Sequence, residues 1–467
     1  MPEPLAYEPG ASPDEAFARD GSVRELYRTL LDELAERDLG ALEQAVNRSA
    51  EQEGVVFGGV GEERAFRLDP VPRVIGAAEW VATSEGLVQR ARALTAFLAD
   101  AYGEARIVSA GRVPERVIES AAYHEPLARG LELRRDGFLA GLDLVRDLDG
   151  RLAVLEDNTR TPSGLGYAIA ARRAVDAELA HLAPAGRLDV QEGYAMVAAA
   201  LRAGAPDGVD DPLVVLLSDG PGNSAWHEHQ QYAARMDVPL VTPDDLAVRG
   251  DRLHARLGGE RPRPVDVVYR RTDEDRLSDE QGRPTWMAEL LLPPAREGTL
   301  TVVNPLGSGL ADDKLVHAYV EDMVRFYLDE EPLLRSATTY DLGDPDGLSD
   351  AMERIGELVV KPRDGYGGIG VVLCRECSRE ELAEVERRVR ADPGSFVAQE
   401  LVSISTHPTV IDGRLAPRHV DLRPFVVGGG HASTTVPGGL SRVAFGAGEM
   451  VVNSSRDGGG KDTWVMG

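Results

Sequence analysis

The sequence predicts a mixed α/β protein built from two α+β lobes and a small inserted α/β domain. Three observations indicate this class. Two apolar runs flank a glycine-rich turn within residues 359–373, which predicts a β-hairpin. Two further apolar runs flank Asp149-Gly150 within 141–158, which predicts a second hairpin. A Gly/Pro/Asp-rich linker at 203–211 then precedes alternating strand and helix patterns.

Length and charge narrow the class of protein further. A chain of 467 residues suggests two or three domains, which we place at 1–204, 205–300 and 301–467. The formal net charge of −27 argues against non-specific binding to nucleic acid or to an anionic membrane. The sequence has neither an apolar run long enough to span a bilayer nor an amino-terminal signal pattern. We therefore expect a soluble, cytoplasmic protein.

The hairpin at 141–158 predicts a metal site. Pairing outward from the turn at 149–150 places Asp143 opposite Glu156, with Asn158 two residues along on the same face. Two carboxylates directly opposite each other repel unless a cation lies between them. Carboxylate and amide oxygens suit Mg²⁺, which shares its remaining positions with phosphates. A solvated hairpin end with both carboxylates exposed is the alternative.

The segment 205–300 is predicted to be a small α/β layer. Strand patterns occur at 213–217 and 265–269, and a helix pattern occurs near 226–236. His227 and His229 lie two positions apart on this helix, so they do not share a face. We expect them to be structural or to face a substrate, with no metal bound.

The glycine-rich turn within 359–373 is a candidate phosphate site. Four glycines crowd into six positions, so the backbone can approach a ligand and its N–H groups can hold phosphate oxygens. A dinucleotide fingerprint would need a helix after the glycines, and a Walker loop would need Gly-Lys-Ser/Thr there. Neither follows. An ordinary glycine-rich hairpin stays open as the alternative.

Lysine usage favours the phosphate interpretation. Of 51 basic residues only three are lysines, and each lies beside glycines or in an acidic segment that opens a helix. They are Lys314, Lys361 and Lys461. A compact ammonium suits a nucleotide phosphate where a wide guanidinium would not fit.

The segments after the glycine hairpin extend the candidate site. Residues 396–402 predict a strand that ends in Gln-Glu-apolar-apolar, which suits an adenine-binding hinge. Arg423 lies on a later strand and could point back to the phosphates. The Gly/Ser/Asn-rich tail at 437–464 is either a mobile lid or a plain loop. Cys374 and Cys377 have C-x-x-C spacing, but lack neighbouring ligands, so we interpret them as incidental thiols.

Together these segments resemble the circularly permuted ATP-grasp family, the relatives of glutathionylspermidine synthase and eukaryotic glutathione synthetase. The matching segments are 69–73, 155–164, 311–314, 359–373 and 453–464. The order of motifs indicates the permutation. An ordinary ATP-grasp chain carries its metal-binding Glu-x-Asn after the adenine hinge, whereas here Glu156 and Asn158 precede the phosphate loop.

The resemblance implies a circularly permuted ATP-grasp fold with a pre-ATP-grasp-like inserted domain, and it implies ATP and Mg²⁺ as cofactors. It implies magnesium ligands at Asp143, Glu156 and Asn158, and it leaves Asp364 undecided. The implied nucleotide contacts are Lys314, Lys361, Gly365, Tyr366, Gly367, Gly368, Gln399, Glu400, Leu401 and Val402.

The resemblance also implies a reaction. The γ-phosphoryl group of ATP would pass to a carboxylate, and an amine would then displace phosphate to form an amide or peptide bond. Arg160 and Arg423 would hold the transferring group, and Lys461 on the closing tail would help to exclude water. Arg160 could equally pair with Asp157. A small-molecule phosphotransferase and a non-catalytic nucleotide-binding partner protein stay open, and the sequence names neither the carboxylate nor the amine, which could be small molecules or peptides.

Overall fold

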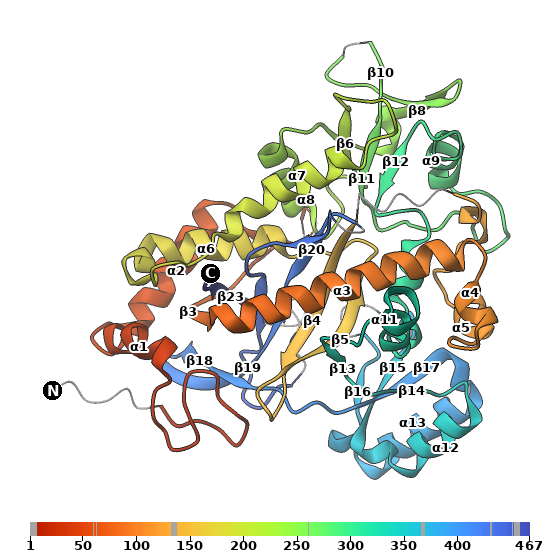
Figure 1. The fold of residues 1–467 in the computed structure, drawn as a ribbon. Helices are drawn as coiled ribbons and strands as arrows, with labels where there is room; N and C mark the ends of the chain where they lie inside the picture. Colours follow the sequence, from red (N-terminus) through yellow and green to blue (C-terminus); the bar gives the residue numbers. More distant parts are fainter. Residues whose placement is uncertain are drawn as a thin grey trace.

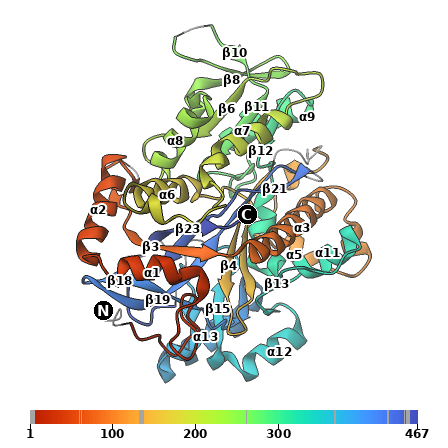
Figure 2. The ribbon, with the colours of Figure 1, turned by 60° about the vertical axis from the view of Figure 1, so that its left-hand side comes forward.

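The computed structural model describes residues 7–58, 60–61, 63–131, 138–259, 261–365, 369–429, 432–450, 452 and 458–467. It confirms the predicted mixed α/β class. A ten-stranded sheet occupies the middle of the molecule. A parallel four-stranded sheet (β6, β7, β11, β12) lies beyond one end of it, and an antiparallel four-stranded sheet (β14–β17) lies near the other (Figures 1 and 2).

The central sheet runs in the order β13-β5-β4-β19-β22-β23-β3, with β18, β20 and β21 attached at its side. Its strands come from both ends of the chain, so the ranges 1–204 and 301–467 share one sheet. The bounds are β3 (Leu68–Ile75), β4 (Leu139–Arg146), β5 (Leu152–Asn158), β13 (Arg335–Ser336), β18 (Thr406–Ile411), β19 (Arg414–Arg423), β20 (Phe425–Val427), β21 (Thr434–Thr435), β22 (Leu440–Val443) and β23 (Gly459–Val465).

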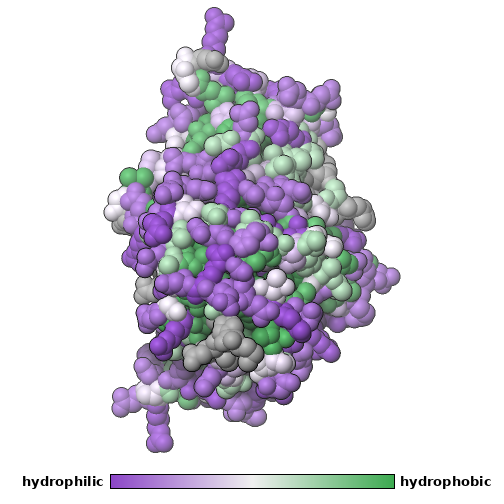
Figure 3. Space-filling model, turned by 90° about the vertical axis from the view of Figure 1, so that its left-hand side faces the viewer, coloured by the Kyte–Doolittle hydropathy of each residue, from purple (hydrophilic) through white to green (hydrophobic). Residues whose placement is uncertain are grey.

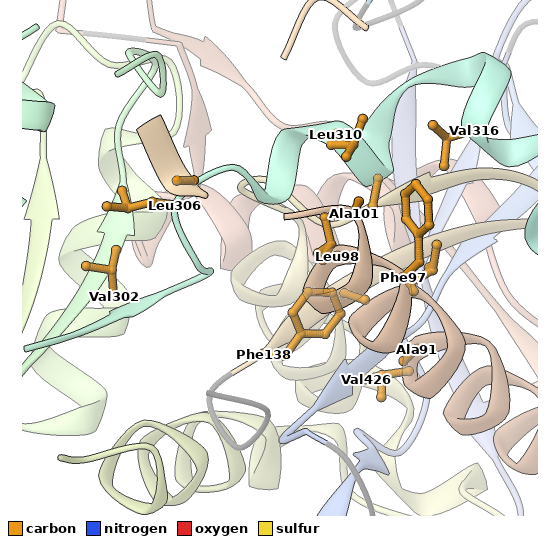
Figure 4. Close-up of a cluster of buried hydrophobic side chains, with 14 of the residues drawn as sticks. Ala91, Phe97, Leu98, Ala101, Phe138, Val302, Leu306, Leu310, Val316 and Val426 are labelled. Carbon is orange, nitrogen blue, oxygen red and sulfur yellow. The ribbon is translucent and has the colours of Figure 1, made fainter. Parts of the chain in front are cut away.

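Strand β4 shows how the sequence divides the two faces of this sheet. Ala140, Leu142 and Leu144 belong to the core around α3 (Ala77–Ala101), whereas Leu139 belongs to the core around α6 (Leu165–Leu179). Alternate residues of a strand point to opposite faces. Figure 4 shows part of the α3 core, in which Phe97 and Leu98 lie near Leu310 and Val426, residues distant in the sequence.

The 141–158 hairpin pairs Asp143 with Glu156, as predicted, but by a different route. The turn is a three-residue loop closed by Asp147 and Arg151, with Gly150 at φ 79°, so the pairing near the turn is one residue away from the predicted register. A bulge between Asp143 and Leu144 then restores the predicted register. Such bulges insert one extra residue in one strand.

The inserted sheet is β7-β6-β11-β12, and all its pairs are parallel. Every residue of β6, β11 and β12 is buried, as expected for strands covered on both faces. The bounds are β6 (Val214–Ser218), β7 (Leu240–Val241), β11 (Val267–Arg271) and β12 (Thr301–Val303), with helices α7 (Gly193–Ala203), α8 (Trp226–Met236) and α9 (Trp286–Arg296) and the small sheet β8 (Leu246–Arg249), β9 (Arg252–Ala255) and β10 (Arg263–Pro264).

The antiparallel sheet β14-β17-β15-β16 carries the glycine-rich hairpin. Val359 pairs with Leu373 and Val360 with Val372, so two strands flank the turn as predicted. Its bounds are β14 (Thr339–Asp341), β15 (Leu358–Pro362), β16 (Val372–Leu373) and β17 (Phe396–Glu400), covered by α12 (Pro345–Glu353) and α13 (Arg379–Ala391).

The remaining segments complete the frame. The segment 308–328 forms three helical pieces, η6 (Ser308–Asp312), α10 (Lys314–His317) and α11 (Val320–Leu328). Among the described residues, no helix is both long and apolar enough to cross a membrane. Hydrophilic residues cover most of the face in Figure 3. The other elements are α1 (Arg28–Leu34), α2 (Leu39–Gln52), β1 (Val56–Phe57), β2 (Arg64–Ala65), α4 (Arg106–Ser109) and α5 (Glu115–Glu119).

Candidate functional site

A cleft of roughly 1180 Å³ lies where the three sheets meet. The central sheet contributes the 143–158 hairpin, the antiparallel sheet contributes β15 and the end of β17, and the inserted sheet contributes the loop after β11. Most of the predicted site residues line it. They are Asp143, Glu156, Asn158, Arg160, Lys314, Lys361, Gly365, Gln399, Glu400, Leu401, Val402 and Arg423.

Lys314 and Lys361 converge on Glu156. Each lysine Nζ lies 3.7 Å from Glu156 Oε1. Burial alone would raise the pKa of Glu156, but the two ammonium groups outweigh burial and lower this pKa. Burial lowers the pKa of Lys361, and Glu156 opposes that shift. The cleft therefore holds two cations around one carboxylate, and polyanions such as nucleotide phosphates suit this arrangement.

Neighbouring backbone and side chains fix the two lysines in place. Lys361 Nζ donates to Gln399 Oε1 at 2.7 Å, and Gln399 lies on the adjacent strand β17. Lys314 Nζ donates to the carbonyl oxygen of Gly365 in the glycine-rich turn. Tyr366, Gly367 and Gly368 lie outside the described residues, so their predicted phosphate contacts stay predictions.

Asp143 is held by two arginines. Arg423 Nε and Nη2 donate to its two carboxylate oxygens at 2.6 and 2.8 Å, and Arg442 Nη2 lies 2.8 Å from Oδ2. Burial alone would raise the pKa of Asp143, but Arg423 and then Arg442 lower it well below its usual range. Sequence reasoning placed Arg423 here but missed Arg442, because Arg442 lies in the tail interpreted as a lid or loop.

The fit of the three predicted magnesium ligands is partial. Glu156 and Asn158 are separated by one residue on β5, and the Nδ2 of Asn158 is buried without a partner among the described residues. Their oxygens are of the kind that Mg²⁺ accepts. Both oxygens of Asp143 are already engaged by guanidinium groups. The described part of the chain contains no group of three or more His, Cys, Asp or Glu residues that could hold a metal ion.

The predicted adenine hinge borders the cleft. Gln399 and Glu400 end β17, and Leu401 and Val402 follow them along the same wall. Glu400 accepts from Tyr340 at 2.8 Å and from Arg354 at 2.9 Å, which fixes the strand end. The wall thus offers apolar side chains beside backbone groups, as a purine would require.

Arg160 lies close to the loop that follows β11 of the inserted sheet. Its guanidinium carbon lies 4.2 Å from the centre of the Tyr123 ring, and its nearest carboxylates are Asp275 at 3.4 Å and Asp312 at 3.9 Å. The alternative pairing with Asp157 is wrong, because Asp157 is bound by Arg90 at 2.5 Å.

Lys461 does not belong to the cleft. It lies on β23, a buried strand that pairs with β22 and β3, and it is fully buried. Its Nζ donates to Asp69 and, at 3.0 Å, to the carbonyl oxygen of Pro408. The expectation of a closing lid that carries Lys461 is therefore wrong. The segment 453–457 lies outside the described residues.

Two further groups lie at the cleft: an acidic run that was not assigned from the sequence, and His229, for which a structural or substrate-facing role was expected. The acidic run 273–275 after β11 lines the cleft, and so does His229 of α8. The signal for the acidic run was available, since three consecutive carboxylates follow a predicted strand. The position of His229 was not predictable, because it depends on how the inserted sheet faces the hairpin.

Comparisons with known proteins give a matching family model and several relatives with similar sequences. Residues 72–444 match the family model described as circularly permuted ATP-grasp type 2. The chain is 41% identical over 462 residues to an uncharacterized protein of Mycobacterium tuberculosis, covering 97% of this chain and 84% of that one. It is 37% identical to an uncharacterized protein of Synechocystis, covering 99% and 98% of the two chains.

One further relative carries a ligase name, and one solved structure has a similar fold. A Frankia casuarinae protein, provisionally named a glutamate–cysteine ligase, is 43% identical over 462 residues, and this chain covers 53% of its length. The structure of a glutathione synthetase-like effector from Globodera pallida, in its apo form, superimposes with a TM-score of 0.59 at 13% identity, covering 92% of this chain and 98% of the effector. At that identity the similarity bears on the fold alone.

Proposed function

The chain belongs to the circularly permuted ATP-grasp type 2 family, and we propose on this basis that it is an ATP- and Mg²⁺-dependent carboxylate–amine ligase. The observation that carries the proposal is the convergence of Lys314 and Lys361 on Glu156, in a cleft that also includes the wall at 399–402. The adenine would lie against that wall, and the two ammonium groups would neutralise the phosphates.

The side chains around the proposed phosphate site would have distinct roles. Glu156 and Asn158 would hold Mg²⁺ through their oxygens. Bound Mg²⁺ would supply positive charge that offsets the charge developing on the transferring phosphoryl group. Asp143 orients Arg423 and Arg442, whose guanidinium groups would face the reacting carboxylate and phosphoryl oxygens. Asp143 as a metal ligand stays a prediction.

The proposed reaction has two steps. A substrate carboxylate oxygen attacks the γ-phosphorus, the bond between that phosphorus and the bridging oxygen breaks, and ADP leaves. An amine nitrogen then attacks the acyl carbon of the acyl-phosphate, the bond to the phosphate oxygen breaks, and the nitrogen loses a proton. The products are an amide, ADP and phosphate. The name of the Frankia relative supports amide formation in general, but this chain covers only 53% of that protein.

Binding of ATP is tested with Lys361→Ala. Calorimetry with Mg²⁺ and a non-hydrolysable ATP analogue should show affinity about 10- to 100-fold lower in this variant, because a charge-assisted contact of roughly 1.5–3 kcal/mol is lost. Arg387→Ala, on the exposed face of α13, is the control and should bind as the wild type does. Equal affinity in both variants would overturn the assignment of the lysine pair.

The reaction class is tested with ATP, a pool of carboxylates and hydroxylamine. A ligase should release ADP and phosphate and trap a hydroxamate. A stable phosphorylated compound with ADP would establish a phosphotransferase instead, and AMP with pyrophosphate would overturn the acyl-phosphate mechanism. ATP binding without any turnover in the presence of the pool would favour a nucleotide-binding partner protein.

A further inference from the structure

The inserted sheet ends at the cleft in a way that favours ligand binding. Strand β6 is followed along the chain by β7 on one side, and β11 lies on its other side. Open α/β sheets bind ligands beyond the carboxyl ends of their strands, at the point where the strand order reverses. The residues that follow these carboxyl ends, 223–225 after β6 and 271–273 at the end of β11, line the cleft.

The amino terminus of α8 is the first donor group at this point. The helix has 11 residues, and its N-cap, Ala225, has no side chain that could accept from the first turn. The first N–H groups of a helix lack intrahelical partners, and the helix dipole adds positive potential there. Residues 223–225 place this terminus at the cleft. A carboxylate suits it.

His229 is the second donor. Its Nδ1 lies 2.8 Å from Ser218 Oγ, and this fully buried hydroxyl oxygen already accepts from the Gly220 N–H at 3.1 Å. Since a buried hydroxyl hydrogen needs an acceptor, Ser218 donates to Nδ1, and the hydrogen of the neutral imidazole therefore resides on Nε2. His229 is 2% exposed and lines the cleft, and its Nε2 has no partner in the described part of the chain.

The charge of His229 is settled by its surroundings. Burial, and then the charge of Arg271, lower its pKa well below the ordinary value, so the imidazole stays neutral. Arg271 itself is bound by the Glu228 carboxylate at 2.6 Å, so its charge is already matched. The N–H of Trp226 already donates to the Asn223 carbonyl oxygen at 3.0 Å. The donors available to a ligand are thus Nε2–H and the other N–H groups of the first turn of α8.

Carboxylates lie directly beside these donors. Asp273 lines the cleft, and its N–H donates to Asp219 Oδ2 at 2.6 Å. The same Asp219 oxygen accepts from Asn223 at 3.0 Å, just before α8. These negative charges would repel a simple anion but would bind an ammonium group. A ligand that carries both charges a short distance apart satisfies both sets of groups.

We propose that this end of the cleft binds the α-amino-acid group of a substrate. The carboxylate accepts from His229 Nε2 and the first turn of α8, and the ammonium group faces Asp273. The inference rests on the proposed function, since it names a substrate class for the same cleft. The reacting carboxylate or amine then lies elsewhere on the substrate, toward the lysine pair.

The experiment uses the full chain with Mg²⁺ and ADP and measures binding by saturation-transfer NMR. The probes are the proteinogenic amino acids, each compared with its α-amide and its N-acetyl derivative. At least one amino acid should bind, and both of its derivatives should bind about tenfold or more weakly. Failure of every amino acid to bind, or equal binding of an α-amide, would overturn the inference.

Variants on one helix make the test specific. His229→Ala should weaken binding of the amino acid about tenfold and remove its preference over the α-amide. His229→Gln keeps an N–H donor and should therefore retain part of that preference. This variant replaces His229→Ala in the test if the alanine variant misfolds. Arg235→Ala, an exposed residue in the last turn of α8 and outside the cleft lining, should behave as the wild type does. ADP affinity is measured in each sample, because nucleotide binding without amino-acid binding contradicts this inference but not the proposed function.

Discussion

At the residue scale, Glu125 shows how burial controls the charge of a carboxyl group. Its Oε2 accepts from the Leu277 N–H at 2.9 Å, and burial raises its pKa to about 7 from an ordinary value of 4.5. The folded protein therefore favours the protonated form. The stability that this preference contributes is complete below pH 4.5 and is lost as pH rises through 7.

Glu125→Gln tests this titration. The variant cannot ionise, so its stability relative to the wild type should improve between pH 5 and pH 8 by on the order of 1–3 kcal/mol. Urea unfolding at the two pH values measures the change. Glu384→Gln, an exposed substitution, should show no such pH-dependent difference. The same stability difference at both pH values for Glu125→Gln would contradict the raised pKa.

At the scale of elements, the loop that follows Asn158 is held mainly by side chains from other elements. Asp312 accepts from the N–H groups of Thr159 and Arg160, and Arg271 donates to the Pro162 carbonyl oxygen. Glu228 Oε1 accepts from the N–H groups of Gly164 and Gly166 at 2.8 and 3.0 Å. Side chains of β11, α8 and η6 thereby fix the backbone next to the proposed metal ligands before any ligand binds.

Glu228→Gln should therefore be costly. The substitution leaves the Arg271 guanidinium buried without its carboxylate, and breaking a buried pair costs about 3–5 kcal/mol. Urea unfolding measures this loss. Glu384→Gln breaks an exposed pair with Arg387 and should cost far less than Glu228→Gln. Equal losses in the two variants would show that the Glu228 pair does not hold this loop.

The hairpin and the tail show what the sequence could predict. Asp149-Gly150 marked the turn, but the predicted pairing of Asp143 with Glu156 holds only because a bulge compensates for the longer turn. That bulge has no local signal in the sequence. In the tail, glycines suggested a loop, but Arg442 and Lys461 lie on buried strands that are stabilised by pairing with distant parts of the chain. Local composition does not encode such long-range pairing.

At the scale of the whole molecule, the last strand of the described chain pairs in the central sheet with β3, a strand from the amino-terminal part. Strand β23 lies between β22 and β3 and pairs in parallel with β3, although hundreds of residues separate them in sequence. In Figures 1 and 2 the carboxyl terminus accordingly lies within the body of the molecule. The cleft depends on this closure, because β22 carries Arg442 to Asp143.

Lys461 joins three distant segments at this closure. Its Nζ bonds to Asp69 on β3 and to the Pro408 carbonyl oxygen on β18, and both Lys461 and Asp69 are fully buried. Lys461→Met would leave the Asp69 carboxylate buried without its cation. We expect a loss of about 3–5 kcal/mol in urea unfolding, and a smaller loss in the double variant Asp69→Asn with Lys461→Met, which removes both charges.

The same variant separates a structural role from a catalytic one. Under conditions in which Lys461→Met is folded, its affinity for the ATP analogue should stay within about twofold of the wild type, a difference of less than 0.5 kcal/mol, because Lys461 lies outside the cleft lining. Calorimetry at low temperature, with circular dichroism on the same sample, measures both properties. A folded variant that no longer binds the nucleotide would show that Lys461 contributes to the nucleotide site after all. Retained affinity with lowered stability would instead establish it as the residue that ties β23 to β3 and so keeps the cleft assembled.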